Sequence, residues 1–533
     1  MFFTPGVLLN CHKIFALFLS ISFLVAGCVK VGPDFAKPEA KVNPDWLEAG
    51  AYKQISLKAT DNRNWWRSFN DPVLDRFIQD AYRQNLPLRL AGVRVLEARA
   101  QVGVVTGQLY PQSQQLTGSV QRIRFSQTNL SSGIDTPTNF WLSAIGLSAS
   151  WEIDFWGKIR RAIESADASL LAAVSDYDNA LVTLTGDVAT AYILLRTLEK
   201  RLAIARQNVE VQKKSLQIAT SRWKGGTTSL RDVEQAKTVL DSTEATIPTL
   251  ESQVRQTQNA LCLLMGLPPT DLKQYLGAKS AIPAPPTEVA LGIPADLLRR
   301  RPDIQSAEWQ AAAQCAKIGV SKADLLPAFS LSGSFGFSAT NVGDFTLADM
   351  FQSRSRAWMF GPSVQWNIFN YGRIMNQVRV QDARFQELLI NYQNTVLKAQ
   401  QEVENALIAF LKAQQRAQKL AGSTAAAKKA VELAMLQYRE GIADFTTVLT
   451  AEQNLLSQQD ALAVTLGEIS SNLVGVYRAL GGGWQIREGQ EVVPPETKAA
   501  MASRTNWGNL LSLVTLPPQP LEPPKHQIRP PQW

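Results

Sequence analysis

The sequence predicts a mainly helical chain that also carries part of a membrane β-barrel and consists of two tandem copies of one unit. The pattern W-x-I-x-x-[WY]-G-[KR]-I occurs twice, beginning at Trp151 and at Trp366. Each occurrence ends a stretch of alternating apolar and polar residues and opens a long segment without proline. The alternation predicts a half-buried strand, and the long segment predicts a helix.

Composition narrows the class of protein. The chain has 533 residues, 19% of them charged and 45% hydrophobic, which is typical neither of a disordered protein nor of a polytopic helical membrane protein. The net charge of +8 is spread over a mixed surface, so we expect no nucleic-acid partner. The two histidines, His12 and His526, lie outside the repeats, which excludes a histidine-based triad or zinc site there. We expect no cofactor, no metal and no catalytic residues.

The N-terminus predicts a secreted, lipid-anchored protein. An apolar stretch over 14–26 precedes Gly27 and Cys28, which resembles the lipobox of bacterial lipoproteins. Cys28 is then the lipidated residue (palmitate) and 1–27 the signal peptide. Val29 instead of aspartate favours the outer membrane. The alternative is an ordinary signal peptide followed by a chance cysteine.

Two further cysteines, Cys262 and Cys315, lie in the body of the chain. A disulfide between them is possible in an oxidising periplasm. We favour two separate buried thiols, because each lies in an apolar helical context.

The duplication extends over roughly 87–266 and 302–481, at an offset of 215 residues. In each long helix the apolar positions step by four and three, which is the heptad pattern of a coiled coil. A helix over Lys158–Lys224 would be about 100 Å long, which suits a tube-like assembly or, alternatively, a filament. We expect the same four elements in each copy. In the first copy they are a helix, a β-hairpin over about 114–155, a long helix over 157–224 and a return helix over 228–266. In the second copy they are a helix, a β-hairpin over about 329–369, a long helix over 372–440 and a return helix over 443–481.

The predicted strands carry tryptophans at both ends. Trp141 and Trp151 are ten residues apart, about 33 Å along a strand, which matches the two aromatic girdles of an outer-membrane barrel. The second copy repeats the alternation, with Trp358 and Trp366 on one face and eight residues apart. The alternative is a soluble two-stranded flap with one buried face.

Four strands per chain cannot close a barrel, and open edges are not tolerated in lipid, so the chain must oligomerise. Two copies would supply eight strands and three would supply twelve. The helices begin directly after the strands, at Gly157 and Gly372, so a helical tube should continue the barrel. Glu152 and Asp154, near this junction, either line a lumen or solvate the strand end.

Five stretches together resemble the TolC/OprM family of trimeric outer-membrane efflux channels, in its lipoprotein (NodT-type) branch, over residues 28–485. They are Val31–Phe35, Trp65–Pro72, Arg300–Ile304, Tyr438–Phe445 and Leu480–Trp484.

The resemblance implies a homotrimer with a twelve-stranded β-barrel in the outer membrane and a twelve-helix α-barrel in the periplasm. It implies passive exit of small molecules (drugs, metals or other toxic compounds) from an inner-membrane RND-type transporter through a periplasmic adaptor, and no enzymatic activity. Residues 28–86 would form the lipidated and equatorial segment, 267–301 an equatorial linker, and 482–533 a proline-rich, partly disordered tail.

In this family the tips of the helices form a periplasmic mouth that is closed at rest. Asp444 falls where the OprM-like branch has a ring of carboxylates, although it could instead cap the following helix. Tyr438 and Arg439 are gating candidates; the alternative is ordinary packing. Thr447 and Thr450 replace the two aspartates of the TolC type at this mouth.

Two rival functions remain: a lipid-tethered coiled-coil scaffold without a pore, and a carboxylate-based cell-wall hydrolase. The scaffold would lack strands exposed to lipid. The hydrolase would need a cleft with paired acids, for which the sequence offers only Glu152 and Asp154.

Overall fold

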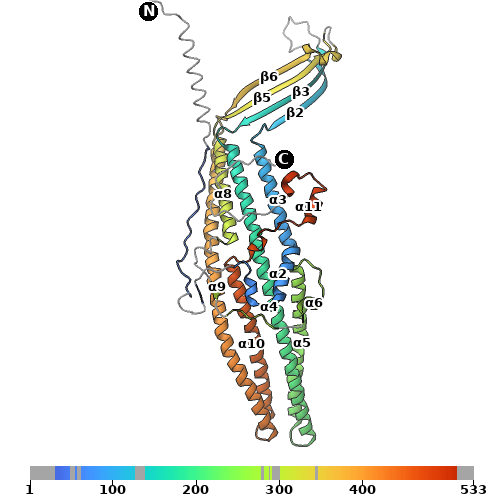
Figure 1. Ribbon diagram of the computed structural model, residues 1–533, viewed down its shortest axis with the longest axis vertical. Helices are drawn as coiled ribbons and strands as arrows, with labels where there is room; N and C mark the ends of the chain where they lie inside the picture. Colours follow the sequence, from blue (N-terminus) through green and yellow to red (C-terminus); the bar gives the residue numbers. More distant parts are fainter. Residues whose placement is uncertain are drawn as a thin grey trace, which may run out of the picture.

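The computed structural model describes residues 30–48, 55–56, 62–126, 138–277, 281–286, 289–290, 300–342 and 346–512. The predicted lipid site, Cys28, lies outside these residues. The described chain is elongated, with a β-sheet at one end and a long helical body that extends from it (Figure 1).

Three pairs of helices make up most of the helical body, and the two members of each pair have the same length. Helices α4 and α9 run its whole length, α3 and α8 flank their upper half, and α5 and α10 flank their lower half (Figure 1). The pairs are α3 (Leu86–Gly107) with α8 (Pro302–Ala323), 22 residues each; α4 (Lys158–Lys224) with α9 (Arg373–Arg439), 67 each; and α5 (Leu230–Leu264) with α10 (Phe445–Ala479), 35 each.

One four-stranded antiparallel sheet has the order β2-β3-β5-β6, so β2 and β6 are its edges. Its strands are β2 (Ser113–Arg124), β3 (Asn139–Ile153), β5 (Ala328–Thr340) and β6 (Arg356–Gln365). The predicted second hairpin extended to about 369, which is wrong because β6 ends at Gln365 and Trp366 lies beyond it. The short strands β1 (Ile55–Ser56) and β4 (Val289–Ala290) pair in parallel.

Each long helix begins immediately after a glycine in the left-handed conformation. Gly157 (φ 74°) precedes α4 and Gly372 (φ 78°) precedes α9. At Gly157 a side chain would also approach Lys30 Cα to 3.0 Å. Glycine adopts this conformation without steric cost, so the chain can turn sharply from strand into helix.

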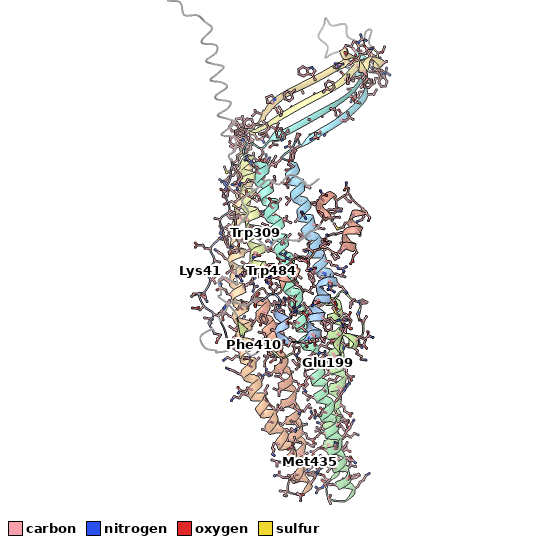
Figure 2. The ribbon with its side chains drawn as sticks, in the orientation of Figure 1. Lys41, Glu199, Trp309, Phe410, Met435 and Trp484 are labelled. Atoms are coloured by element: carbon pink, nitrogen blue, oxygen red, sulfur yellow. The ribbon has the colours of Figure 1, made fainter. Side chains whose placement is uncertain are left out.

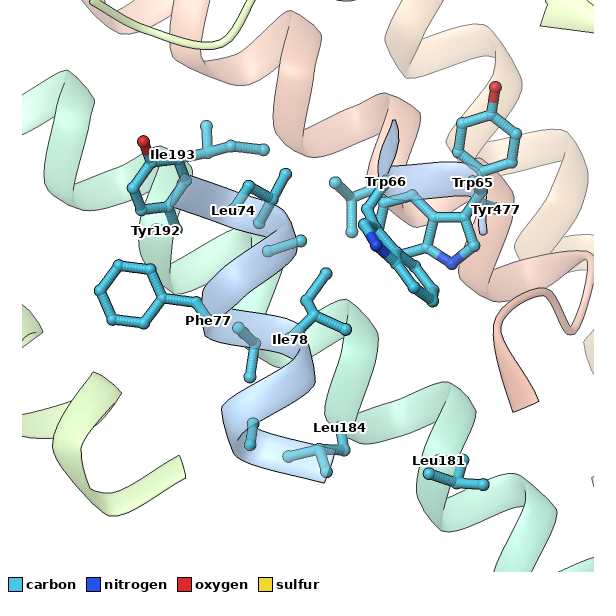
Figure 3. Packing of buried hydrophobic residues seen from close by; sticks show 14 of the residues in the cluster. Trp65, Trp66, Leu74, Phe77, Ile78, Leu181, Leu184, Tyr192, Ile193 and Tyr477 are labelled. Carbon is cyan, nitrogen blue, oxygen red and sulfur yellow. The ribbon is translucent and has the colours of Figure 1, made fainter. Parts of the chain in front are cut away.

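The main core lies at mid-height, around α2 (Pro72–Gln84) and the short helix α6 (Lys273–Leu276). Trp65 stacks on Tyr477 of α10, and Phe77 packs on Tyr192 of α4, on either side of α2 (Figure 3). Asp71 caps α2 by accepting from the amides of Val73 and Leu74. The Trp65–Pro72 stretch therefore ties the N-terminal segment to both repeats.

The C-terminal segment up to residue 512 is more ordered than predicted. It forms α11 (Pro495–Ala502), and Val492 and Val493 are buried in the main core. Arg487 forms a fully buried ion pair with Asp178 of α4, with Nη2 2.8 Å from Oδ2. Pro494 and Pro495 lie at the start of α11, whereas the prolines from Pro517 onward lie outside the described residues.

Candidate functional site

The tips of the two helical hairpins carry the predicted gate residues. Asp444, Thr447 and Arg439 are exposed at the second tip. Asp444 occupies the position before α10, but its side chain makes no capping hydrogen bond. Its carboxylate therefore remains available to groups outside the chain.

Tyr438 differs from its neighbours because it is buried. Its ring packs on Phe445 with the centroids 4.9 Å apart, and its hydroxyl has no hydrogen-bond partner among the described residues. The sequence left two roles open for Tyr438, gating and ordinary packing. Within the described part of one chain the ring packs on its neighbours, and the hydroxyl forms no hydrogen bond that could hold a gate closed.

Arg222 is the tip residue that the sequence reasoning missed. Its Nη1 donates to the carbonyl oxygen of Tyr438 at 2.5 Å and of Arg439 at 3.4 Å, and its guanidinium lies over the Tyr438 ring at 4.6 Å. These carbonyls end α9, where the helix dipole is negative. Arg222 thus joins the two hairpin tips of one chain.

Above this contact, α4 carries a ladder of polar residues that faces α10. Arg201, Asn208 and Ser215 are spaced by seven residues, so they lie on one stripe of α4. Arg201 bonds Asp460 at 2.7 and 3.1 Å, Asn208 bonds Gln459 at 2.8 Å, and Ser215 donates to Glu452 at 2.5 Å. We call these residues and their α10 partners the polar seam.

Apolar side chains pack within each hairpin and at the tip. Leu198, Ala205 and Leu250 join α4 to α5, and Val431 and Leu455 join α9 to α10. A further cluster joins all four helices at the tip, where Met435 lies (Figure 2). Each hairpin therefore has an apolar interior, whereas the contact between α4 and α10 carries polar pairs from Ser215 up to Arg201, below the apolar main core.

At the strand–helix junction, the two lumen candidates have different positions. Asp154 lies beyond the end of β3, and its carboxylate accepts from the amides of Ile159 and Arg160 and from Arg160 Nε, at 2.9 to 3.0 Å. It is an anion bound at the start of α4, and its place in a lumen stays a prediction. Glu152 is half-buried within β3.

The tryptophans near the junction make equivalent contacts in the two repeats. Trp151 Nε1 donates to the carbonyl oxygen of Leu109, and Trp366 Nε1 donates to that of Leu325, each at 3.0 Å. Both carbonyls follow the end of a helix, α3 or α8. Trp141 lies near the other end of the sheet and is 40% exposed. Trp358 is 76% exposed and pairs with Phe335, which pairs with Leu147 near the middle of β3.

Cys262 and Cys315 are both free and buried, so the preference for two separate thiols is confirmed. Within the part of the chain that the structure describes, no group of three or more His, Cys, Asp or Glu could hold a metal ion.

Comparison with known proteins agrees with this architecture. A model of the family described as outer membrane efflux protein matches residues 77–267 and 293–482, one match per repeat. The pyoverdine export outer membrane protein OpmQ of Pseudomonas putida is 33% identical, over 80% of this chain and 90% of its own length. The probable outer membrane lipoprotein SilC of Salmonella typhimurium is 28% identical, over 89% of this chain and 99% of its own.

Solved structures give the same result. The outer-membrane channel OprN is 34% identical, with a TM-score of 0.79, over 86% of this chain and 100% of that chain. Together with the duplicated helices and the four-stranded sheet, these matches place the chain in a family of channel proteins. The chain belongs to the outer membrane efflux protein family.

Proposed function

We propose that three copies of this chain form a passive exit duct across the outer membrane and periplasm. The duct works with a periplasmic adaptor and an inner-membrane RND-type pump, and it carries small molecules such as drugs, metals or other toxic compounds. The observation that carries this proposal is the four-stranded sheet with two unpaired edges, set on a duplicated helical body. Three such sheets supply twelve strands, enough to close a barrel.

The mouth of the duct lies at the helical tips. The Arg222 contact with Tyr438 and Arg439 holds the two hairpins of each chain together in the closed state. Exposed Asp444 side chains from three chains form an acidic ring that favours cations, and Thr447 lies one turn further along α10. An adaptor opens the mouth by separating the hairpins.

The remaining site residues serve the membrane end. Trp141 and Trp358 form one aromatic girdle, and Trp151 and Trp366 form the other beside the junction. Glu152 faces the lumen at this level. A lipid on Cys28 anchors the chain, which the lipoprotein name of SilC supports. The chain itself catalyses no reaction.

Conductance of the purified protein in planar bilayers tests the gate. Arg222→Ala should leak, with higher conductance than the wild type and greater sensitivity of the host to large antibiotics. Arg206→Ala is the matched control, because Arg206 lies on the same helix but bonds Glu251 within its own hairpin at 2.7 Å. Equal conductance in all three proteins would refute the Arg222 contact as a gate.

A further inference from the structure

Glu452 is a buried carboxyl group in the polar seam. It lies on α10, two turns above the tip, and is 2% exposed within a single chain. Oε1 accepts from the hydroxyl of Ser215 on α4, which is 1% exposed, and Oε2 has no hydrogen-bond partner among the described residues. One turn above Ser215, the buried amide of Gln212 also has no partner among these residues. The carboxyl group thus lies between two helices of different hairpins.

Among the described residues, no hydrogen bond or ion pair joins Glu452 to a cationic side chain. Arg222 is bonded to carbonyls of α9, Lys213 of α4 pairs with Glu244 of α5 and Glu210, and Asp232 of α5 accepts from Thr228. On α9, Lys428, Lys429 and Glu432 are exposed. Burial raises the pKa of Glu452, and only the Ser215 hydroxyl opposes this. An uncompensated carboxylate is costly in such a site, so the neutral form is favoured.

We propose that Glu452 is a proton-operated lock between α4 and α10, neutral while the hairpins are together and ionised once they separate at the periplasmic mouth. This inference rests on the proposed function, because it concerns the same mouth.

The direction of the pH effect on opening follows from the difference in the pKa of Glu452 between the closed and the open state. The pKa is above its ordinary value in the closed state and returns toward that value when water reaches the separated helices. A bound proton therefore stabilises the closed state. This contribution is complete at low pH and is lost as the pH rises through the raised pKa. Each unit of difference in pKa changes the ratio of open to closed states by up to about tenfold.

Two measurements over a pH series that begins near the ordinary pKa of a glutamate side chain and extends upward test the lock. The first is the open fraction of the purified protein in planar bilayers. It should rise with pH in the wild type and in Asp444→Asn, and should stay low at every pH in Glu452→Gln, which mimics the neutral acid. Retention of the pH response by Glu452→Gln, or its loss in Asp444→Asn, would overturn the proposal.

The second measurement does not require conduction. Spin labels at Thr227→Cys and Ile442→Cys report the separation of the two tips of one chain. Their distance should lengthen with pH in the wild-type background and remain constant with Glu452→Gln; an equal response in both backgrounds contradicts the lock. If no variant conducts, Arg222→Ala included, the duct proposal fails. The spin-label distances still show whether Glu452 controls the separation of the two tips. The mass of each variant in detergent confirms its assembly.

Discussion

At the scale of single residues, Arg161 holds the N-terminal segment against the helical body. Its side chain is 1% exposed and donates to the carbonyls of Val31 and Gly32 and to the carboxylates of Asp34 and Glu164, at 2.8 to 3.0 Å. Lys30 also pairs with Glu164 at 2.9 Å. A single buried guanidinium therefore organises the chain immediately after the predicted lipid site.

Replacing Arg161 with methionine should release this segment. The acceptors it leaves in a buried site lose their donor, which should cost on the order of 2 kcal/mol or more. Limited trypsin digestion of the assembled protein should then cleave after Lys41 much faster than in the wild type. Arg89→Met is the control, because Arg89 pairs with the exposed Glu496 at 3.0 Å. Unchanged cleavage in Arg161→Met would show that other contacts hold the segment.

Acid should have the same effect. Burial favours the neutral form of Glu164, but Lys30 and Arg161 outweigh it and hold the pKa below its ordinary value of 4.5. The stabilisation is therefore present above that value and is lost as the pH falls through the lowered pKa. Pepsin digestion at decreasing pH should release the N-terminal segment of the wild type in this acidic range. A Glu164→Gln protein should show no such step.

The two cysteines give a further prediction at this scale. Burial raises the pKa of the Cys315 thiol to about 11, and the thiolate is the reactive form. Maleimide should therefore label neither Cys262 nor Cys315 in the folded protein, and both after unfolding in urea, as measured by mass spectrometry. Labelling of either thiol in the folded protein would contradict its buried position.

At the scale of elements, the two repeats share contacts that position the sheet on the helices. Trp151→Phe and Trp366→Phe each remove one indole hydrogen bond and should each lower the free energy of unfolding by about 1 kcal/mol. The double variant should be additive within about 0.5 kcal/mol if the sites are independent. Denaturant midpoints in detergent measure this effect. Trp358→Phe, at an exposed indole, is the control and should leave the free energy of unfolding nearly unchanged. An equal loss in this control would show that the smaller ring, and not the lost hydrogen bond, lowers the stability.

The sequence predicted the helices and strands better than it predicted the contacts between them. The heptads and flanking glycines mark both long helices, because periodicity and turn conformation are local properties. The partners of Arg222 are backbone carbonyls, which leave no trace in the sequence, although an arginine in the last helical turn is a weak signal. From the sequence, Asp154 is predicted at the end of a strand. Its binding to the first amides of α4 depends on how the next helix begins, which the strand pattern does not indicate. The burial of Val492 and Val493 is a tertiary effect that local composition does not encode.

At the scale of the whole molecule, the free edges of β2 and β6 require partners from neighbouring chains. Light scattering corrected for detergent should give three protomers, each close to the 58.7 kDa of the full chain less any cleaved leader. A stable monomer would leave both edges unpaired and favour the tethered scaffold.

The equal lengths of the paired helices constrain how this molecule can change over evolution. Both halves reach the tip through 67 residues and return through 35. An insertion in one half alone would displace its tip by about 1.5 Å per residue and shift the polar seam out of register. Lineages with longer or shorter ducts should therefore have gained or lost residues in multiples of seven, in both halves and on both the descending and the returning helix.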